Sequence, residues 1–261
     1  MFDPVRIRIT YHRIILLLSI NNLLSSIASF CGSWPIPRDA VNKVYKASGT
    51  ILTCTMQGFI LLYTYQTMFM YILLLCILTF ISVRNDFSTK STLKCEIFSH
   101  VIIHLYSLII PSIASNLKLL NPAINICFIA LYPMRCQDDA FSQPCLREGH
   151  DGKIITNLYR VSLFVTVIFC ITIITIAVLL TVLYFHVRWK ENLNKNLRGK
   201  RLFFETARKK KSRAICRRAL LYSCTALLTH VPSAINRVIL HFSGKLYFPI
   251  FITGIIMYPM S

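Results

Sequence analysis

The stretch that decides the fold is VSLFVTVIFCITIITIAVLLTVLYFHV, residues 161–187, which holds no Asp, Glu, Lys or Arg over 27 positions. The segment that follows it, 188–218, holds thirteen Lys or Arg against two Glu. About 20 apolar residues are enough for a helix to cross the core of a bilayer. Because loops rich in Lys and Arg resist translocation, we expect 188–218 to be cytoplasmic. The two segments together predict a membrane-spanning helix whose C-terminal end lies inside.

The composition supports a membrane protein. The chain has 261 residues, of which 55% are hydrophobic and only 15% charged. This disfavours the alternative of a soluble protein with one buried helix and a basic tail that binds nucleic acid. The net charge of +19 comes largely from one place, because 188–218 carries 13 minus 2, or 11, of those charges between two apolar segments. We therefore expect membrane lipids and no nucleic acid among the partners.

Uncharged runs along the chain predict an all-α, multi-pass transmembrane bundle that forms a single domain over 1–261. The second run has no charged residue for 35 positions and would measure about 52 Å as a helix, more than a bilayer core of about 30 Å, so this helix is expected to tilt or project. The N-terminal segment 1–13 is polar and basic, and no cleavable signal peptide is apparent. The expected helices are about 14–33, 49–83, 96–116, 160–187 and 219–240, with a partial one at 246–261.

Alternation of the helices then orients the loops. If 188–218 is inside, the N-terminus and 86–94 are inside as well. The loop around SWPIPRD, 33–39, and the long loop 118–159 are outside. The N-terminal segment agrees independently, because it holds three Arg against one Asp.

Several local sequences, in order, resemble seven-helix G-protein-coupled receptors. The likeness is to the divergent receptor-like proteins of diatoms and related protists, which share features with cyclic-AMP-type and secretin-type receptors. The segments that carry it are TYHRIILLLSINNLLSSI (10–27), SWPIP (33–37), GTILTCTMQGF (49–59), ISVRNDF (81–87), NICFIALYPMRC (125–136), YRVSLFV (159–165), RALLYSCTALLTHVPSAINRV (218–238) and MYPMS (257–261).

This resemblance implies a receptor-like bundle with helices 2 to 6 and part of helix 7, lacking helix 1 and the end of helix 7. It implies signalling from an extracellular small ligand to a heterotrimeric G protein, and a location in the plasma membrane. One departure is VRND, 83–86, which stands where rhodopsin-type receptors carry an acidic-Arg-aromatic triplet.

The resemblance also implies a disulfide from Cys54, at the outer start of the second helix, to the long outer loop. Cys127 matches the family's position best, and Cys136 and Cys145 remain alternatives because four cysteines allow three connectivities. Unpaired thiols or palmitoylation sites are the competing interpretation, which an oxidising outer compartment disfavours.

On the inner face, Arg84 lies where the family has an Arg that contacts a partner protein. A snorkelling residue at the membrane boundary explains it equally well. Lys209, Lys210 and Lys211 lie in the basic stretch and are candidates for docking a G protein. Contact with anionic lipid alone is the favoured explanation, because polybasic segments next to a membrane bind such lipids.

Polar residues inside the expected helices are the remaining site candidates, since burying them without partners is costly. His100 and His104 are spaced i to i+4, as metal ligands can be, but packing or hydrogen bonding is favoured because no acidic or thiol ligand adjoins them. Pro232 is the expected hinge of the helix over 219–240. Gln57 and Asn236 are candidates for a ligand cavity. The other polar residues of this kind are Asn21, Asn22, Gln66, His230 and Arg237.

Other functions fit less well. A transporter or channel, or a non-signalling receptor fragment, is the alternative, but no internal repeat is visible and no Asp or Glu lies in the interior of an expected helix. An enzyme is not expected, because the ten acidic residues lie mostly in loops and no catalytic motif occurs. No cofactor or metal is expected. A bound retinal is disfavoured because the last apolar run offers no Lys beyond Lys245 at its edge.

Overall fold

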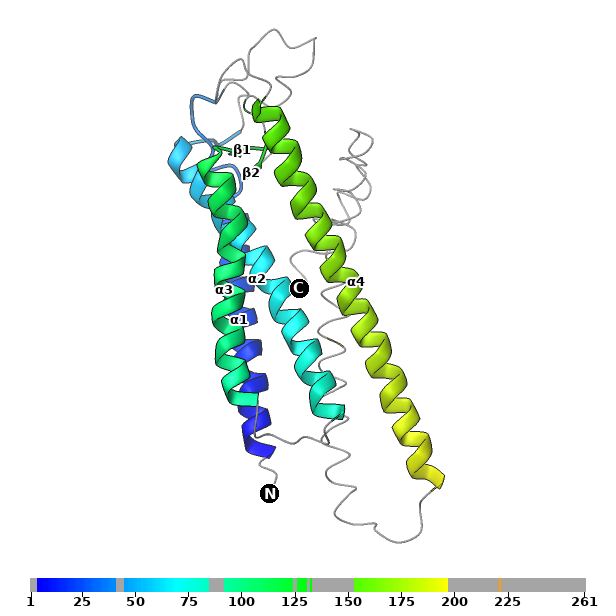
Figure 1. Ribbon diagram of the computed structural model, residues 1–261. Coiled ribbons are helices and arrows are strands. Elements are labelled where there is room, and N and C mark those ends of the chain that lie inside the picture. Colours follow the sequence, from blue (N-terminus) through cyan, green and yellow to red (C-terminus); the bar gives the residue numbers. More distant parts are fainter. Residues whose placement is uncertain are drawn as a thin grey trace. The chain divides into compact units, whose positions relative to one another are not determined.

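The protein is mostly helical, as predicted. The computed structural model describes residues 4–40, 45–84, 92–123, 126–130, 132, 153–196 and 221. Within them lie four helices and one two-stranded antiparallel sheet, which the sequence did not predict (Figure 1). In chain order these are α1 (Pro4–Phe30), α2 (Ile51–Arg84), α3 (Thr92–Asn116), β1 (Leu120–Pro122), β2 (Cys127–Ile129) and α4 (Lys153–Asn196).

Each of the four helices contains a segment long and apolar enough to cross a membrane. These segments correspond to the first four predicted ones. The predicted helices at 219–240 and 246–261 lie outside the described residues, apart from Leu221. The candidate spans are His12–Phe30, Ile51–Ile81, Glu96–Asn116 and Leu163–His186.

The helices at the two ends of the described chain are longer than predicted. α1 begins at Pro4 rather than at residue 14, and α4 continues to Asn196. The first nine residues of the basic stretch, 188–196, are therefore helical and not loop. Loss of hydropathy marks where a membrane crossing ends, but Arg, Lys and Glu are good helix formers, so the helical backbone continues past that point.

The loop boundaries are also corrected. α1 ends at Phe30 rather than residue 33, and Gly32 follows in the left-handed region with a φ of 50°. Glycine is the residue that adopts this conformation at helix ends with no steric cost. The predicted outer loop 118–159 contains β1, β2 and the first turns of α4.

The chain divides into two compact units. Unit 1 comprises Met1–Leu16, Phe69–Ser99 and Phe169–Ser261, and unit 2 comprises Leu17–Met68 and His100–Ile168. The single domain predicted for 1–261 stays a prediction. Among the described residues of unit 1, the buried apolar side chains include Ile14, Tyr71, Ile72, Leu75, Ile176 and Leu183.

Unit 2 has a hydrophobic cluster built from a helix, a helix end and the sheet. Leu62 of α2 packs with Ala114 of α3 and with Leu119 and Leu120. Partly buried apolar residues surround this cluster, among them Val161 of α4. The others are Phe59, Leu117, Phe128 and Ile129. The sheet is thus held against the helices by the same apolar contacts that hold the helices together.

Candidate functional site: a disulfide-linked junction in unit 2

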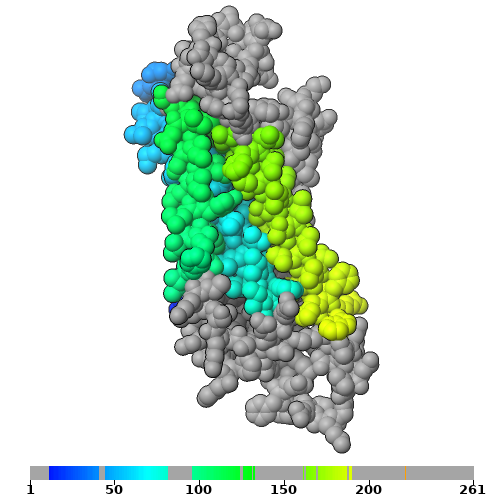
Figure 2. Space-filling model, viewed as in Figure 1, coloured from blue at the N-terminus to red at the C-terminus, as the bar shows by residue number. Residues whose placement is uncertain are grey.

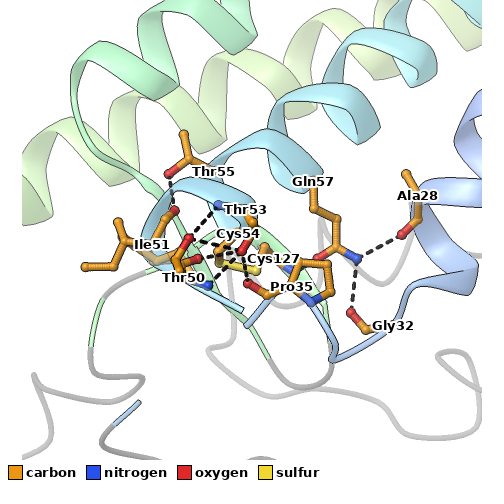
Figure 3. Close-up of a disulfide and its surroundings, with 12 residues drawn as sticks. Ala28, Gly32, Pro35, Thr50, Ile51, Thr53, Cys54, Thr55, Gln57 and Cys127 are labelled. Carbon is orange, nitrogen blue, oxygen red and sulfur yellow. Dashed lines mark hydrogen bonds between the residues drawn. A yellow bond between two sulfur atoms is a disulfide. The ribbon is translucent and has the colours of Figure 1, made fainter. Parts of the chain in front are cut away.

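A disulfide joins the first turn of α2 to strand β2. It links Cys54 and Cys127, which are 73 positions apart in the sequence, and their Cα atoms are 5.2 Å apart (Figure 3). Both residues are buried in a small apolar cluster with Ile36 and Ala40. This is the pair that the resemblance favoured. The alternatives Cys136 and Cys145 lie outside the described residues.

The start of α2 is capped by two threonines. Thr50 Oγ1 accepts from the Thr53 N–H at 3.3 Å, and Thr53 Oγ1 accepts from the Thr50 N–H at 2.8 Å. This reciprocal arrangement satisfies N–H groups that have no partner within the helix. The Thr53 hydroxyl also lies 2.8 Å from the carbonyl oxygen of Pro35, to which it donates (Figure 3). Thus the cap also ties α2 to the segment that follows α1.

Position 49, just before this cap, accepts only glycine. A Cβ there would lie 2.2 Å from the carbonyl oxygen of Pro35, an impossible contact. The close approach lets the Gly49 N–H donate to the Ile36 carbonyl at 2.9 Å. The segment 35–38 therefore lies directly against the entry to α2.

Gln57, one turn after Cys54, connects three elements through its side-chain amide. Its nitrogen donates to the carbonyl oxygens of Ala28 at 2.8 Å and Gly32 at 3.0 Å, at the end of α1 (Figure 3). Its oxygen accepts from the Cys127 N–H at 3.0 Å. Gln57 is only 4% exposed, so these bonds satisfy polar groups shielded from solvent. They favour a structural role for Gln57 over contact with a ligand.

The two strands form a hairpin that packs against α2. Leu120 pairs with Ile129, and Pro122 pairs with Cys127. Gly58 allows the close approach, because a Cβ at this position would lie 3.3 Å from both the Cys127 carbonyl oxygen and a Leu120 methyl group. A Cβ on residue 58 would require Cys127 or Leu120 to shift by a few tenths of an ångström.

Asn121 closes the base of this hairpin. Its side-chain nitrogen donates to the carbonyl oxygens of Lys118 and Ala130, both at 2.9 Å. The residue is buried, so the two bonds compensate for the loss of water around its amide.

Farther along α2, a tyrosine and a histidine link α2 to α3. Tyr63 Oη lies 2.7 Å from His104 Nδ1, which places a short hydrogen bond between the helices. Its geometry supports the packing role predicted for His104 in preference to metal binding. Asn21 Nδ2 donates to the Leu17 carbonyl of its own helix at 2.8 Å. Gln66 Oε1 is buried with no hydrogen-bond partner among the described residues.

Unit 1 contains a buried acidic residue that sequence reasoning missed. α3 begins at Thr92 and so places Glu96 inside a helix, which corrects the expectation that no acidic residue lies in a helix interior. Glu96 is 1% exposed, and its Oε1 lies 3.8 Å from Nη1 of Arg13 on α1. The sequence places Arg13 only in a basic N-terminal segment, because nothing in the local pattern pairs it with a residue 83 positions away.

The remaining predicted site residues are only partly visible. Arg84 is the last residue of α2, and its side chain lies outside the described part of the structure. Pro232 and Asn236, the predicted hinge and cavity residues, lie outside the described residues. So do the other candidates of the C-terminal part, Lys209, Lys210, Lys211, His230 and Arg237.

One local signal for the junction was available in the sequence, because the apolar run 126–129 is long enough for a short strand. The dipeptide Asn121-Pro122 is typical of a turn but lies in strand β1. The bonds made by Gln57 had no such signal, because main-chain acceptors carry no sequence pattern.

The contacts at the junction are structural in their chemistry. The hairpin is held against α2 by a disulfide, by the Gln57 amide, whose nitrogen and oxygen are both hydrogen-bonded, and by main-chain hydrogen bonds. These groups offer neither a nucleophile nor a base to a substrate. No protein-family model matches the chain, and no curated protein is detectably similar to it in sequence.

Proposed function

We propose that this chain is an integral membrane protein of the seven-helix receptor type, which binds an extracellular ligand and signals to a heterotrimeric G protein. The four apolar helices support membrane integration. The order of local motifs that resembles G-protein-coupled receptors supports the receptor class. We place the protein in the plasma membrane on the same grounds.

The observation that carries the proposal is the agreement of two independent signals on one orientation. The Cys54–Cys127 disulfide requires an oxidising compartment at the start of α2 and at the hairpin after α3. The basic stretch 188–218 requires the opposite side at the end of α4. Between Cys127 and residue 188 the chain would cross the membrane once, through α4, so these two positions lie on opposite sides. Redox chemistry and charge thus favour the same topology.

The hairpin gives this topology a receptor-like feature. A covalent link between α2 and the segment before α4 holds a small folded element at the outer face, where a ligand arrives. The hydrogen bonds of the Gln57 side chain connect this element to the end of α1.

Glycosylation mapping tests the orientation. The sequence has no Asn-X-Ser/Thr acceptor, so any N-glycosylation that is observed must be at the engineered site. An acceptor inserted after Tyr45 is expected to be glycosylated in microsomal membranes, whereas one inserted after Arg201 is expected to stay unmodified. Modification of both sites, or of the second alone, contradicts the topology and with it the receptor proposal.

Nucleotide exchange tests the signalling part. We expect the full chain in vesicles to accelerate binding of a labelled GTP analogue by purified heterotrimeric G protein, even without added ligand. The triple variant Lys209→Gln, Lys210→Gln, Lys211→Gln loses most of this effect if these lysines dock the G protein and keeps it if they contact lipid alone. Arg38→Gln, on the opposite face by the proposed topology, should retain the effect in either case. Exchange equal to that in protein-free vesicles contradicts signalling and leaves only the non-signalling alternatives.

A further inference from the structure

The inner end of α4 carries exposed aromatic and basic side chains immediately after the apolar span. The span ends at His186, and Phe185 and Trp189 on either side of this end are 65% and 62% exposed. Tyr184 and Arg188 are exposed as well. Figure 2 shows the surface of α4, the helix that carries these side chains, in yellow-green. Large exposed aromatic residues beside a cation are typical of the boundary between hydrocarbon and headgroups.

Arg188 is held in place by a neighbour on its own helix. Its Nη1 donates to the Tyr184 hydroxyl at 2.6 Å, and its guanidinium carbon lies 5.8 Å from the centre of the Tyr184 ring. Residues four apart lie on one face of a helix, so the helix itself imposes this arrangement. A guanidinium has five N–H donors in a planar fork that fits a phosphate with two parallel bonds. The bond to Tyr184 orients the fork and uses one of these donors.

Ring contacts also order the rest of the cluster. The Trp189 ring lies 6.2 Å from the His186 ring, which in turn lies 6.4 Å from Phe80 of α2, all within unit 1. Tyr184 and Phe185 meet edge to face at 5.7 Å. Aromatic pairs at these distances attract each other. The exposed rings are therefore part of a fixed arrangement and not isolated surface residues.

We propose that Tyr184, Phe185, Arg188 and Trp189 form a binding site for the headgroup phosphate of an anionic phospholipid in the cytoplasmic leaflet. The inference rests on the proposed membrane integration and orientation. Arg188 binds the phosphate, and Phe185 and Trp189 lie among the glycerol groups and the adjoining first carbons of the acyl chains. Charge complementarity favours this occupant, because the stretch that begins at Arg188 holds thirteen Lys or Arg against two Glu. The basic stretch attracts anionic lipid in general, and this cluster selects where a headgroup is bound.

Tryptophan quenching tests the proposal directly, because the chain has only two tryptophans, Trp34 and Trp189. In the Trp34→Phe variant, Trp189 is the sole reporter. The full chain is reconstituted in vesicles that contain either phosphatidylserine or phosphatidylcholine with brominated acyl chains, at equal mole fraction. We expect brominated phosphatidylserine to quench Trp189 more strongly, because its headgroup keeps a net negative charge, whereas the choline cation offsets the phosphate charge in phosphatidylcholine. The apparent preference should be about fivefold, the factor that one basic residue close to an anionic surface provides.

Three further variants separate a site from diffuse attraction. Arg188→Gln is expected to remove most of the preference, and Tyr184→Phe, which keeps the ring but loses the hydroxyl, to weaken it. Lys210→Gln removes one charge from the same basic stretch without touching the cluster, and it should leave the preference nearly unchanged. An equal loss in Arg188→Gln and Lys210→Gln overturns the proposal in favour of diffuse charge.

The remaining outcomes distinguish this inference from the proposed function. Equal quenching by the two brominated lipids, in protein that resists alkaline carbonate extraction, overturns the lipid site while membrane integration stands. The lipid site is also overturned if acrylamide in the water quenches Trp189 and neither brominated lipid does. Protein that alkaline carbonate extracts from the vesicles contradicts membrane integration itself, and the lipid site with it.

Discussion

Helices α2 and α4 are both apolar enough to span a bilayer, but they differ in how much of their surface the rest of the protein buries. In the candidate span of α2, 61% of the most apolar window is buried within the protein, and in that of α4 only 18%. The less buried helix is the more apolar of the two. Hydropathy therefore predicts that a helix crosses the membrane, but not whether it faces other helices or lipid.

One polar residue accounts for part of the difference. The buried Gln57 amide of α2 has partners on α1 and β2, whereas the three buried threonines of α2 each donate to a carbonyl of their own helix. Thr175 and Thr181 of α4 are exposed, and each donates to a carbonyl of its own helix, four residues before it. Polar groups in hydrocarbon must be satisfied by the protein. A helix whose polar groups bond within itself can face lipid, whereas one that needs outside partners must lie among other elements.

The largest loss of stability is expected when the disulfide at the start of α2 is removed. Cys54→Ala is expected to lower the free energy of unfolding by about 4 kcal/mol, because the bond closes a long loop in the unfolded chain. Denaturant titration in mild detergent measures the change, and reductant should destabilise the natural protein but not the variant. Cys31→Ala, at a free cysteine after α1, is the control and should have a small effect. Equal stability of the Cys54 variant and the natural protein would show that the bond does not form.

Core truncation compares the two helices directly. Leu62→Ala on α2 is expected to cost about 3 kcal/mol, because Leu62 is 2% exposed and packs with Ala114 and the sheet. Ile174→Ala on α4 should cost less than about 1 kcal/mol, since Ile174 is 61% exposed. The same titration measures both. Equal costs would show that α4 is covered by protein rather than by lipid.

A third test uses two glutamines on the same helix. Gln57→Leu should cost about 2 kcal/mol, because it leaves the Ala28, Gly32 and Cys127 main-chain groups without their side-chain partner. Gln66→Leu removes a buried amide oxygen that has no hydrogen-bond partner among the described residues, and it should cost little. A larger loss in the Gln66 variant than in the Gln57 variant would contradict the assignment of Gln57 as the structural residue.

The smallest effect is expected at the bond between α2 and α3. Tyr63→Phe removes the hydroxyl that lies 2.7 Å from His104 Nδ1, and should cost about 1 kcal/mol. A double-mutant cycle with His104→Leu isolates the pair, because the Tyr63 substitution should have almost no effect once His104 is replaced. Additive costs would show that the two side chains do not interact.

Local patterns were sufficient for much of this fold. The ends of the predicted helix 49–83 differ from those of α2 by two residues or fewer, because charged residues and a glycine bracket the run. The bounds of α1 and α4 could not be predicted as well, since their helical backbone continues into basic sequence where hydropathy no longer reports on it. The hairpin was missed because its strands are three residues each, too short for a periodic pattern.

The sequence by itself determined that the chain is helical and apolar enough to cross a membrane, and its charges predict which ends are inside. These properties are sums over neighbouring residues, so they can be read locally. Only the tertiary structure decided which polar residues meet. Gln57 with Cys127, Arg13 with Glu96 and Tyr63 with His104 lie 41 to 83 positions apart, and their contacts depend on how helices and hairpin come together. The physical reason is that a hydrogen bond or ion pair needs two atoms within a few ångströms, a condition that no local pattern of residues encodes.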